Sequence, residues 1–333
     1  MAETSTDLGP AAKNLSDLYR NAGKTTSATA EDHINSAKRF VSGMSRPLLQ
    51  QMGLSGTTTK TPVVVLDLAC GSGVVTQELQ RELPVEVLEK SRFVAGDSSE
   101  ALVGIVGKRI EAEDWRNVEA RVTDAMVRRL GHIHLGRRDS TDVYLQDTKL
   151  PDGTFSHVCV AMGLHLIPRP DDALRGVYAE IKRIIKPGGI LGATTPHFDP
   201  EHSSMQFEFR SAFASFPFEA PFPDPFPTQM HSHGRWADPS WVETYLRDEQ
   251  GLKDVEAGLV KGAFHVEEAD DFLASFWPMA EWIMGSWWSE ETRREHPPRE
   301  VRELTRKFLV EKHGREGWDV EWAVVCATGR VEK

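Results

Sequence analysis

The sequence contains little cysteine. Its 333 residues include three, Cys70, Cys159 and Cys326, which are scattered and lack any CxxC spacing. An odd number with these spacings predicts neither a disulfide framework nor a zinc site. We therefore expect a reducing, intracellular setting and no bound metal.

Long apolar runs are missing as well. The first residues, "MAETSTDLGPAAKNLSDLYR", hold no apolar run of the signal-peptide type. No window approaches the roughly 18 apolar residues that a membrane-spanning helix needs. The sequence thus predicts a cytoplasmic protein that has no membrane partner.

Positive charge is also scarce, with 39 Lys and Arg against 50 Asp and Glu and a formal net charge of −11. A protein that binds a phosphate backbone would need a basic stripe. The basic residues between positions 128 and 138 form only a local patch, which we interpret as a solvated insertion. We expect no nucleic-acid partner, whereas the acidic balance would not oppose a cationic ligand.

Strand and helix patterns alternate from residue 62 onward. "VVVLDLA", "SRFVAGDSS", "NVEARVTDA", "FSHVCVAMGL" and "GILGATT" have the pattern of strands, and "VVTQELQREL", "ALVGIVGKRIEAEDW" and "DDALRGVYAEIKRIIK" that of helices. Repeated βαβ units of this kind predict an α/β fold with a doubly wound, Rossmann-like parallel sheet. Ligands of such sheets bind at the carboxyl ends of the strands, beside the first strand.

The rest of the chain divides around this core. Before it, residues 32–54 predict one or two helices; after it, residues 252–264 predict a sixth strand, 266–316 helices, and 319–331 a seventh strand that closes the sheet. The expected units are an N-terminal arm with cap helices (1–60), a cofactor-binding core (61–200), a substrate-side lid with helices and the sixth strand (201–318), and the last strand (319–333).

The glycine turn after the first strand indicates the kind of ligand. Gly71 and Gly73 are followed by Thr76 where a dinucleotide site has its third glycine, and no GK[ST] follows for a Walker loop. Asp67, four residues before Gly71, would repel a pyrophosphate but would favour a ligand with an ammonium and a sulfonium. These features favour S-adenosyl-L-methionine, a nucleoside without phosphate.

Acids at the ends of later strands support a nucleoside ligand. Asp97 ends the second strand, 24 residues after Gly73, at the offset where an acid accepts ribose hydroxyls. Asp124 ends the third strand and could accept from the adenine amino group. Asp147 competes for that role, because the insertion around residues 126–146 leaves the strand assignment ambiguous; we favour Asp124.

Four ordered motifs, "VVLDLACGSG", "GDSSEAL", "LPDGTFSHVCVAMGLHLIP" and "ALRGVYAEIKRIIKPGGILGATT", resemble those of class I S-adenosylmethionine-dependent methyltransferases. More narrowly, "WRNVEARV", "PFPTQ", "WWSEETRREH" and "AVVCATG" resemble fungal secondary-metabolite methyltransferases, including those that S-methylate epidithiol metabolites. The resemblance implies a seven-stranded methyltransferase sheet, with S-adenosyl-L-homocysteine as the product.

The resemblance also implies roles for individual residues. The backbone of the loop would face the methionine part of the cofactor, Asp97 the ribose, and the residues after the second and third strands the adenine, while those after the fourth strand would line the methionine and the transferring methyl. In that order, the cofactor-binding residues are Ala69, Cys70, Gly71 and Gly73; Asp97; Ser98, Asp124 and Ala125; Met162 and Gly163.

Methyl transfer is an in-line displacement at carbon, so positioning and exclusion of water can supply most of the acceleration. A thiol acceptor would need little help from a base, whereas a phenol or an alcohol would need more. His165, shortly after the fourth strand, is the first candidate base, although structural packing is an open alternative; His197 is a weaker candidate.

Aromatic segments are the candidates for the substrate side. Phe272, Phe276, Met279 and Ile283 recur at helical spacing, which fits either a core stripe or the roof of a cleft that accepts a flat apolar molecule. We therefore expect a methyltransferase for a small apolar or aromatic secondary metabolite. The alternative is a non-catalytic protein of the same fold that binds a partner protein. The acceptor atom (S, O, N or C) and the oligomeric state stay open.

Overall fold

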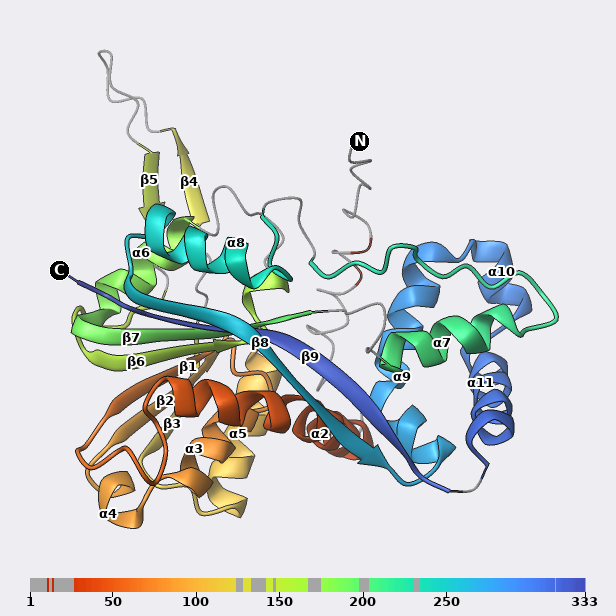
Figure 1. The fold of residues 1–333 in the computed structure, drawn as a ribbon, viewed down its shortest axis with the longest axis horizontal. Helices are drawn as coiled ribbons and strands as arrows, with labels where there is room; N and C mark the ends of the chain where they lie inside the picture. The colour runs from red at the N-terminus through yellow and green to blue at the C-terminus, as the bar shows by residue number, and fades with distance from the viewer. Residues whose placement is uncertain are drawn as a thin grey trace.

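The computed structural model describes residues 11, 14, 27–123, 128–132, 142–145, 148–166, 175–197, 204–229, 234–314 and 316–332. This part of the chain forms a seven-stranded sheet in the order β3-β2-β1-β6-β7-β9-β8 (Figure 1). Its strands are β1 Val64–Leu68, β2 Arg92–Asp97, β3 Val118–Val122, β6 Phe155–Ala161, β7 Ile185–Pro196, β8 Lys253–Val266 and β9 Trp318–Arg330. β9 is antiparallel to both of its neighbours, and the pairs from β3 to β7 are parallel. The predicted doubly wound methyltransferase sheet is confirmed, including the sixth and seventh strands.

Helices alternate with these strands and then gather after β7. They are α2 Ser27–Gln51, α3 Val74–Glu82, α4 Val85–Leu88, α5 Glu100–Ala112, α6 Arg175–Ile184, α7 Ser204–Ala214, α8 Pro239–Thr244, α9 Ala269–Trp287, α10 Glu290–Glu295 and α11 Pro298–His313, with the short helical turns η1 Leu164–Leu166 and η3 Tyr245–Glu249. The segment predicted as one or two helices is the single helix α2, which continues through Pro47. In the described residues, no helix combines the length and the apolarity that crossing a membrane requires.

The sheet is the middle layer of three, because successive residues of a strand point to opposite faces. On β1, Leu66 belongs to an apolar cluster that includes side chains of α6 and α8, whereas the neighbouring Val65 belongs to another that includes side chains of α2 and α3. Both residues are at most 1% exposed. Because helices cover both faces of β1, the strand requires apolar residues at successive positions. The carboxyl end of β1 therefore lies between two helical layers.

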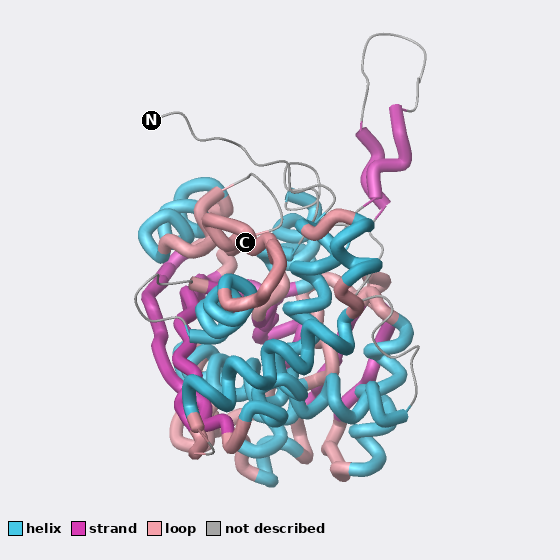
Figure 2. Tube along the Cα trace, turned by 90° about the vertical axis from the view of Figure 1, so that its right-hand side faces the viewer, coloured by secondary structure: helices cyan, strands magenta, loops and turns pink. Residues whose placement is uncertain are grey.

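A second core lies beside the sheet and consists largely of aromatic rings. It joins α7, α9 and α11 with the irregular segment at residues 215–229 (Figure 1). Ala11 is also part of this core, and its carbonyl oxygen accepts a hydrogen bond from Trp282 Nε1 at 2.9 Å. The predicted insertion contains a separate antiparallel pair, β4 Arg128–His132 and β5 Asp142–Leu145, which projects from the body in both views (Figures 1 and 2).

Candidate active site

The carboxyl ends of β1 and β6 meet in an unusual backbone conformation. Ala69, after β1, has φ 58°, and Met162, after β6, has φ 56°. Residues other than glycine rarely adopt such values, and clusters of them mark functional sites. A Cβ added at Gly163 would lie 3.2 Å from the Cβ of Ala69. The structure thus brings together three residues that the resemblance assigns to the methionine end of the cofactor.

The glycine loop is fastened to the end of β2. Gly71 N donates to Asp97 Oδ2 at 2.9 Å, Cys70 N donates to the Gly96 carbonyl at 3.0 Å, and Ser99 N donates to Asp97 Oδ1 at 2.9 Å. These bonds hold the Asp97 carboxylate, which is 9% exposed, at the carboxyl edge of the sheet. A carboxylate oxygen can accept more than one hydrogen bond. Ser98 is exposed next to it.

The two loop glycines differ in their surroundings. Gly71 has φ 55°, and a Cβ added there would meet no atom within 4 Å in the part of the chain that the structure describes. Gly73 has φ 79°, and a Cβ added there would lie 3.2 Å from the rings of Trp115 and the methyl of Val106. Glycine is required at 73 for packing, whereas at 71 it leaves the backbone open to close approach by a ligand.

Asp67 lies beneath this loop and is 2% exposed. Its Oδ2 accepts from Thr76 N at 3.1 Å and from Thr76 Oγ1 at 2.8 Å. Burial raises the pKa of Asp67 to about 7, against the opposing effect of the hydrogen bonds from Thr76. Thr76, which stands where a dinucleotide site has its third glycine, is therefore the hydrogen-bond partner of Asp67. Together they fix the start of α3.

The residues present fit a nucleoside that carries an amino acid. Asp97 offers carboxylate oxygens for hydroxyls, and Gly71 offers an open stretch of backbone for a second group. Ser72 Oγ and Thr123 Oγ1 are buried at the same edge and have no hydrogen-bond partner among the described residues. The predicted adenine residues Asp124, Ala125 and Asp147 lie outside the described residues.

The two candidate bases have different settings. His165 belongs to η1, directly beyond Met162 and Gly163, and is 6% exposed. The structure thus places it near the predicted methyl position, and its role stays a prediction. His197 follows β7, and its Nδ1 lies 2.7 Å from the carbonyl oxygen of Ala237, which gives the ring a structural partner.

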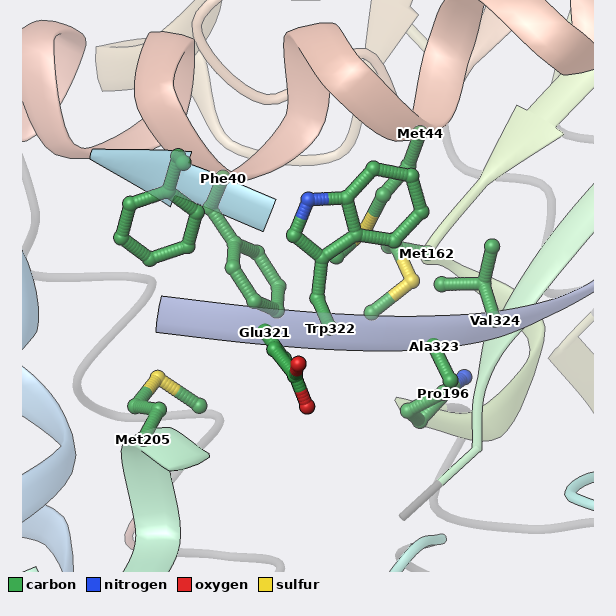
Figure 3. Close-up of a pocket in the computed structure, with 10 residues that line it drawn as sticks. Phe40, Met44, Met162, Pro196, Met205, Glu321, Trp322, Ala323 and Val324 are labelled. Carbon is green, nitrogen blue, oxygen red and sulfur yellow. The ribbon is translucent and has the colours of Figure 1, made fainter. Parts of the chain in front are cut away.

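A small apolar cavity of about 10 Å³ lies beside Met162, between α2 and β9 (Figure 3). At this size it has room for about one water molecule, so its walls must move apart to admit a larger molecule. Four elements (α2, α7, β8 and β9) and the ends of β6 and β7 contribute to its lining. The described lining residues are Phe40, Met44, Met162, Pro196, Met205, Phe264, Glu321, Trp322, Ala323 and Val324. β7 pairs with β9 only as far as Pro196 and Val324, whereas β8 and β9 remain paired to Val266 and Trp318. This two-stranded extension of the sheet is the wall that carries Trp322.

Trp322 lies in a slot made by two glycines. A Cβ added at Gly262, its partner across the strands, would lie 2.3 Å from Cζ2 of the indole, and one added at Gly43 of α2 would lie 3.0 Å away. The ring is 8% exposed. In Figure 3 it lies between Phe40 and Met162 and close to Met44. The absence of side chains at 43 and 262 is what lets the indole lie flat between α2 and β8.

The aromatic helix α9 lies behind this cavity. Phe272 and Ile283 are 0% exposed and pack in the second core, as a core stripe would. Phe276 packs against Phe264 and Phe40, with ring centroids 5.2 and 6.4 Å apart, and Met279 is half-buried. Phe276 thus supports two lining residues, and the roles of the four residues toward the acceptor stay predictions.

Sequence reasoning missed two groups of residues. Arg109 and Trp115 support the glycine loop from below, and the sequence offers only the spacing of Arg109 and Glu113 on one helix as a signal. Phe40 and Met44 lie one helical turn apart on α2 and line the cavity. Their spacing indicated an apolar helix face but not what the face covers.

Residues 60–220 match the family model described as a methyltransferase domain. The chain is 26% identical to the acetylaranotin bis-thiomethyltransferase of Aspergillus terreus over 82% of its own length and 84% of that protein's. It is 24% identical to the methyltransferase tpcH of Aspergillus fumigatus over 85% and 89% of the two lengths. A solved SAM-dependent methyltransferase from Aquifex aeolicus aligns with a TM-score of 0.39 at 18% identity, over 67% of this chain and 83% of that one.

Proposed function

Because the chain contains a class I S-adenosyl-L-methionine-dependent methyltransferase domain, we propose that it methylates a small, largely apolar molecule that binds against the apolar side chains beside Met162, once these side chains move apart to admit it. The observation that carries the proposal is the lining of this cavity. Nine of its ten residues are apolar, and Glu321 is the exception. Such a surface suits a hydrophobic metabolite better than a sugar, a peptide backbone or a nucleotide.

The cofactor's position follows from the residues that fit it. Asp97 would hold the ribose hydroxyls, the backbone from Ala69 to Gly73 the methionine part, and Asp124 or Asp147 the adenine. Met162 and Gly163 would then lie at the methyl, where the cavity begins. When bound, S-adenosyl-L-methionine would supply a methyl group whose carbon accepts the electron pair of a nucleophile, while the positively charged sulfur takes the electron pair of the carbon–sulfur bond that breaks.

The protein's own contribution is mainly positioning. Met162 is fixed because its N donates to the Thr194 carbonyl at 2.9 Å, and the Trp322 ring is fixed in its glycine slot. Fixed walls hold the acceptor in one orientation, and an apolar lining excludes water. Where the acceptor must lose a proton, His165 is the candidate that lies beyond Gly163.

Relatives support a secondary metabolite as the acceptor. The similarity to fungal methyltransferases covers more than four fifths of this chain. One relative is named for methylating thiols. A thiol also needs the least help from a base, since its pKa is near 8.5. An apolar thiol is therefore the first acceptor to test.

Calorimetry with S-adenosyl-L-homocysteine, followed by turnover with a panel of apolar thiols, phenols and amines, tests the proposal. Release of S-adenosyl-L-homocysteine and the methylated product are measured together by mass spectrometry. We expect turnover of apolar thiols, and a raised acceptor KM with unchanged cofactor affinity in Ala323→Leu, which narrows the cavity. Leu259→Ala, at an exposed position of β8, is the control. Cofactor binding without turnover of any small acceptor would contradict the proposal.

A further inference from the structure

Arg109 of α5 is a buried cation directly beneath the glycine loop. It is 4% exposed, and its Nη1 donates to the carbonyl oxygen of Ser72. Its Nε donates to Glu113 Oε1 at 2.8 Å and its Nη2 to Glu113 Oε2 at 3.3 Å. The guanidinium carbon lies 4.7 Å from the centre of a Trp115 ring. The planar guanidinium thus donates hydrogen bonds in two directions and lies over an aromatic ring, and these contacts fix its orientation.

These contacts determine the orientation of one peptide group in the loop. The Ser72 carbonyl points down to Arg109, while Gly73 N, in the same peptide group, donates to the Cys70 carbonyl at 2.8 Å. Trp115 closes the space beneath Gly73. The loop is thus supported at the Ser72–Gly73 peptide group, whereas a Cβ added at Gly71 would meet no atom of the described residues within 4 Å.

Glu113 ties this support to two other helices. Gln77 of α3 donates from Nε2 to Glu113 Oε2 at 2.7 Å, and Lys38 Nζ of α2 lies 3.4 Å from Glu113 Oε1. The helix that starts from the loop and the helix that lines the cavity therefore share one carboxylate. An ion pair that served only α5 would not need these additional partners.

We propose that Arg109 is a positioning residue for the cofactor: by holding the Ser72 carbonyl, it sets the loop backbone that binds the methionine part of S-adenosyl-L-methionine. Removing the guanidinium frees this carbonyl, and the peptide groups from Gly71 to Gly73 lose their fixed orientation. The adenosine part, which relies on Asp97, is affected much less, because Asp97 is held separately by Ser99 N. The proposal does not depend on the identity of the acceptor.

Calorimetric titrations of Arg109→Met with two ligands test this role. S-adenosyl-L-homocysteine has the amino-acid part, and 5′-methylthioadenosine lacks it. We expect binding of the former to weaken at least about tenfold and binding of the latter by less than about threefold. Arg116→Met is the matched control, since Arg116 is an exposed arginine just after α5 whose Nη1 pairs with Glu89 at 3.1 Å. Equal losses for both ligands, or no loss for either, would overturn the proposal.

Two milder variants keep the proposal testable if Arg109→Met does not fold. Arg109→Lys retains the charge but loses the planar guanidinium that donates in two directions. Glu113→Gln loses the charge and one of the two acceptor oxygens. In both we expect faster amide hydrogen exchange in peptides covering residues 69–73 and unchanged exchange in β6. Unchanged exchange in the loop peptides would refute the positioning role. Neither measurement contains an acceptor, so a failure here is distinct from a failure of the proposed acceptor class.

Discussion

The glycine loop after β1 and the cavity between α2 and β9 meet at Met162, yet they are held in different ways. The loop is fixed by individual hydrogen bonds, from Gly71 N to Asp97 and from Thr76 to Asp67. The cavity is fixed by surfaces, with the Trp322 ring against two glycines and Phe264 against Phe276. Point contacts suit a ligand whose atoms are always the same, whereas apolar surfaces suit an acceptor recognised by its shape.

The second core, like the cavity, is held together by packed aromatic side chains. In the second core, Phe272 is 0% exposed, and its ring lies 5.3 Å from Phe209, 4.9 Å from Phe276 and 5.8 Å from Trp318. Substitutions in this core should change the stability of the protein and leave cofactor affinity intact. Substitution of a side chain that would face the cofactor, such as Asp97, should mainly lower cofactor affinity.

The largest effect is expected from Phe272→Ala, which removes a ring from the centre of the second core. We expect the free energy of unfolding to fall by about 3–5 kcal/mol, because the cavity cannot close fully among aromatic neighbours. Urea denaturation measures this loss. S-adenosyl-L-homocysteine affinity of the folded variant should stay within about twofold of wild type. A tenfold loss of that affinity would show that the two regions are not separate. Val310→Ala, at an exposed position of α11, is the control.

Asp67 allows the loop region to be tested through pH. Its pKa is about 7 in the folded protein because of burial and 3.8 ordinarily, so the folded state binds the proton more tightly than the unfolded state. The stability that this proton contributes is fully present below about pH 4 and is lost as the pH rises through 7. Between pH 5 and 8 the loss should be on the order of 3 kcal/mol.

The measurement compares urea denaturation of wild type and Asp67→Asn from pH 5 to 8. Asparagine keeps an oxygen for Thr76 and does not ionise, so the variant should lack this part of the pH dependence. Asp254→Asn, at a highly exposed acid of β8, should follow the wild-type profile. Parallel profiles for wild type and Asp67→Asn would contradict the shifted pKa.

Asp97→Asn should affect binding more than stability. Asparagine has one acceptor oxygen, so its amide nitrogen would face either Gly71 N or Ser99 N, both of which are donors. We expect S-adenosyl-L-homocysteine affinity to fall by about 100-fold, equivalent to about 2.7 kcal/mol. Calorimetry measures this fall, again with Asp254→Asn as the control. An affinity within threefold of wild type would remove Asp97 from the cofactor site.

The loop region is also where sequence reasoning succeeded. Gly71, Asp97 and Gly163 follow strands whose apolar runs are plain in the sequence, and parallel strands bring their carboxyl ends to one edge. The structure brings Gly163 next to Ala69, 94 positions earlier, and Gly71 next to Asp97, as expected for strand ends that meet at one edge. The role of Thr76 was not foreseen, since the bond between Thr76 and Asp67 depends on how α3 packs against β1.

The cavity could not be predicted in the same way. Phe40, Phe264 and Trp322 come from three elements far apart in the sequence, and each has the ordinary pattern of a packed residue. An apolar periodicity indicates that a face is buried but does not say what it is buried against. Only the extension of β8 and β9 beyond β7 brings these residues to Met162.

The smallest and most specific effect is expected from two glycines of β8. Gly262→Ala would place a methyl 2.3 Å from the Trp322 indole, whereas Gly258→Ala, four residues earlier on the same strand, meets no atom within 4 Å. We expect Gly262→Ala to lower the free energy of unfolding by about 1–3 kcal/mol and Gly258→Ala to leave it nearly unchanged.

These two variants also test whether the wall of the cavity acts separately from the loop. In Gly262→Ala the indole must leave its slot, so acceptor KM should change while S-adenosyl-L-homocysteine affinity, which depends on Asp97 and the loop, should not. Steady-state kinetics and calorimetry on the same preparations separate the two quantities. If Gly258→Ala proved as destabilising as Gly262→Ala, the glycine slot would have no special role. If both variants lost affinity for S-adenosyl-L-homocysteine, the wall of the cavity and the hydrogen-bonded glycine loop would be one coupled site at Met162.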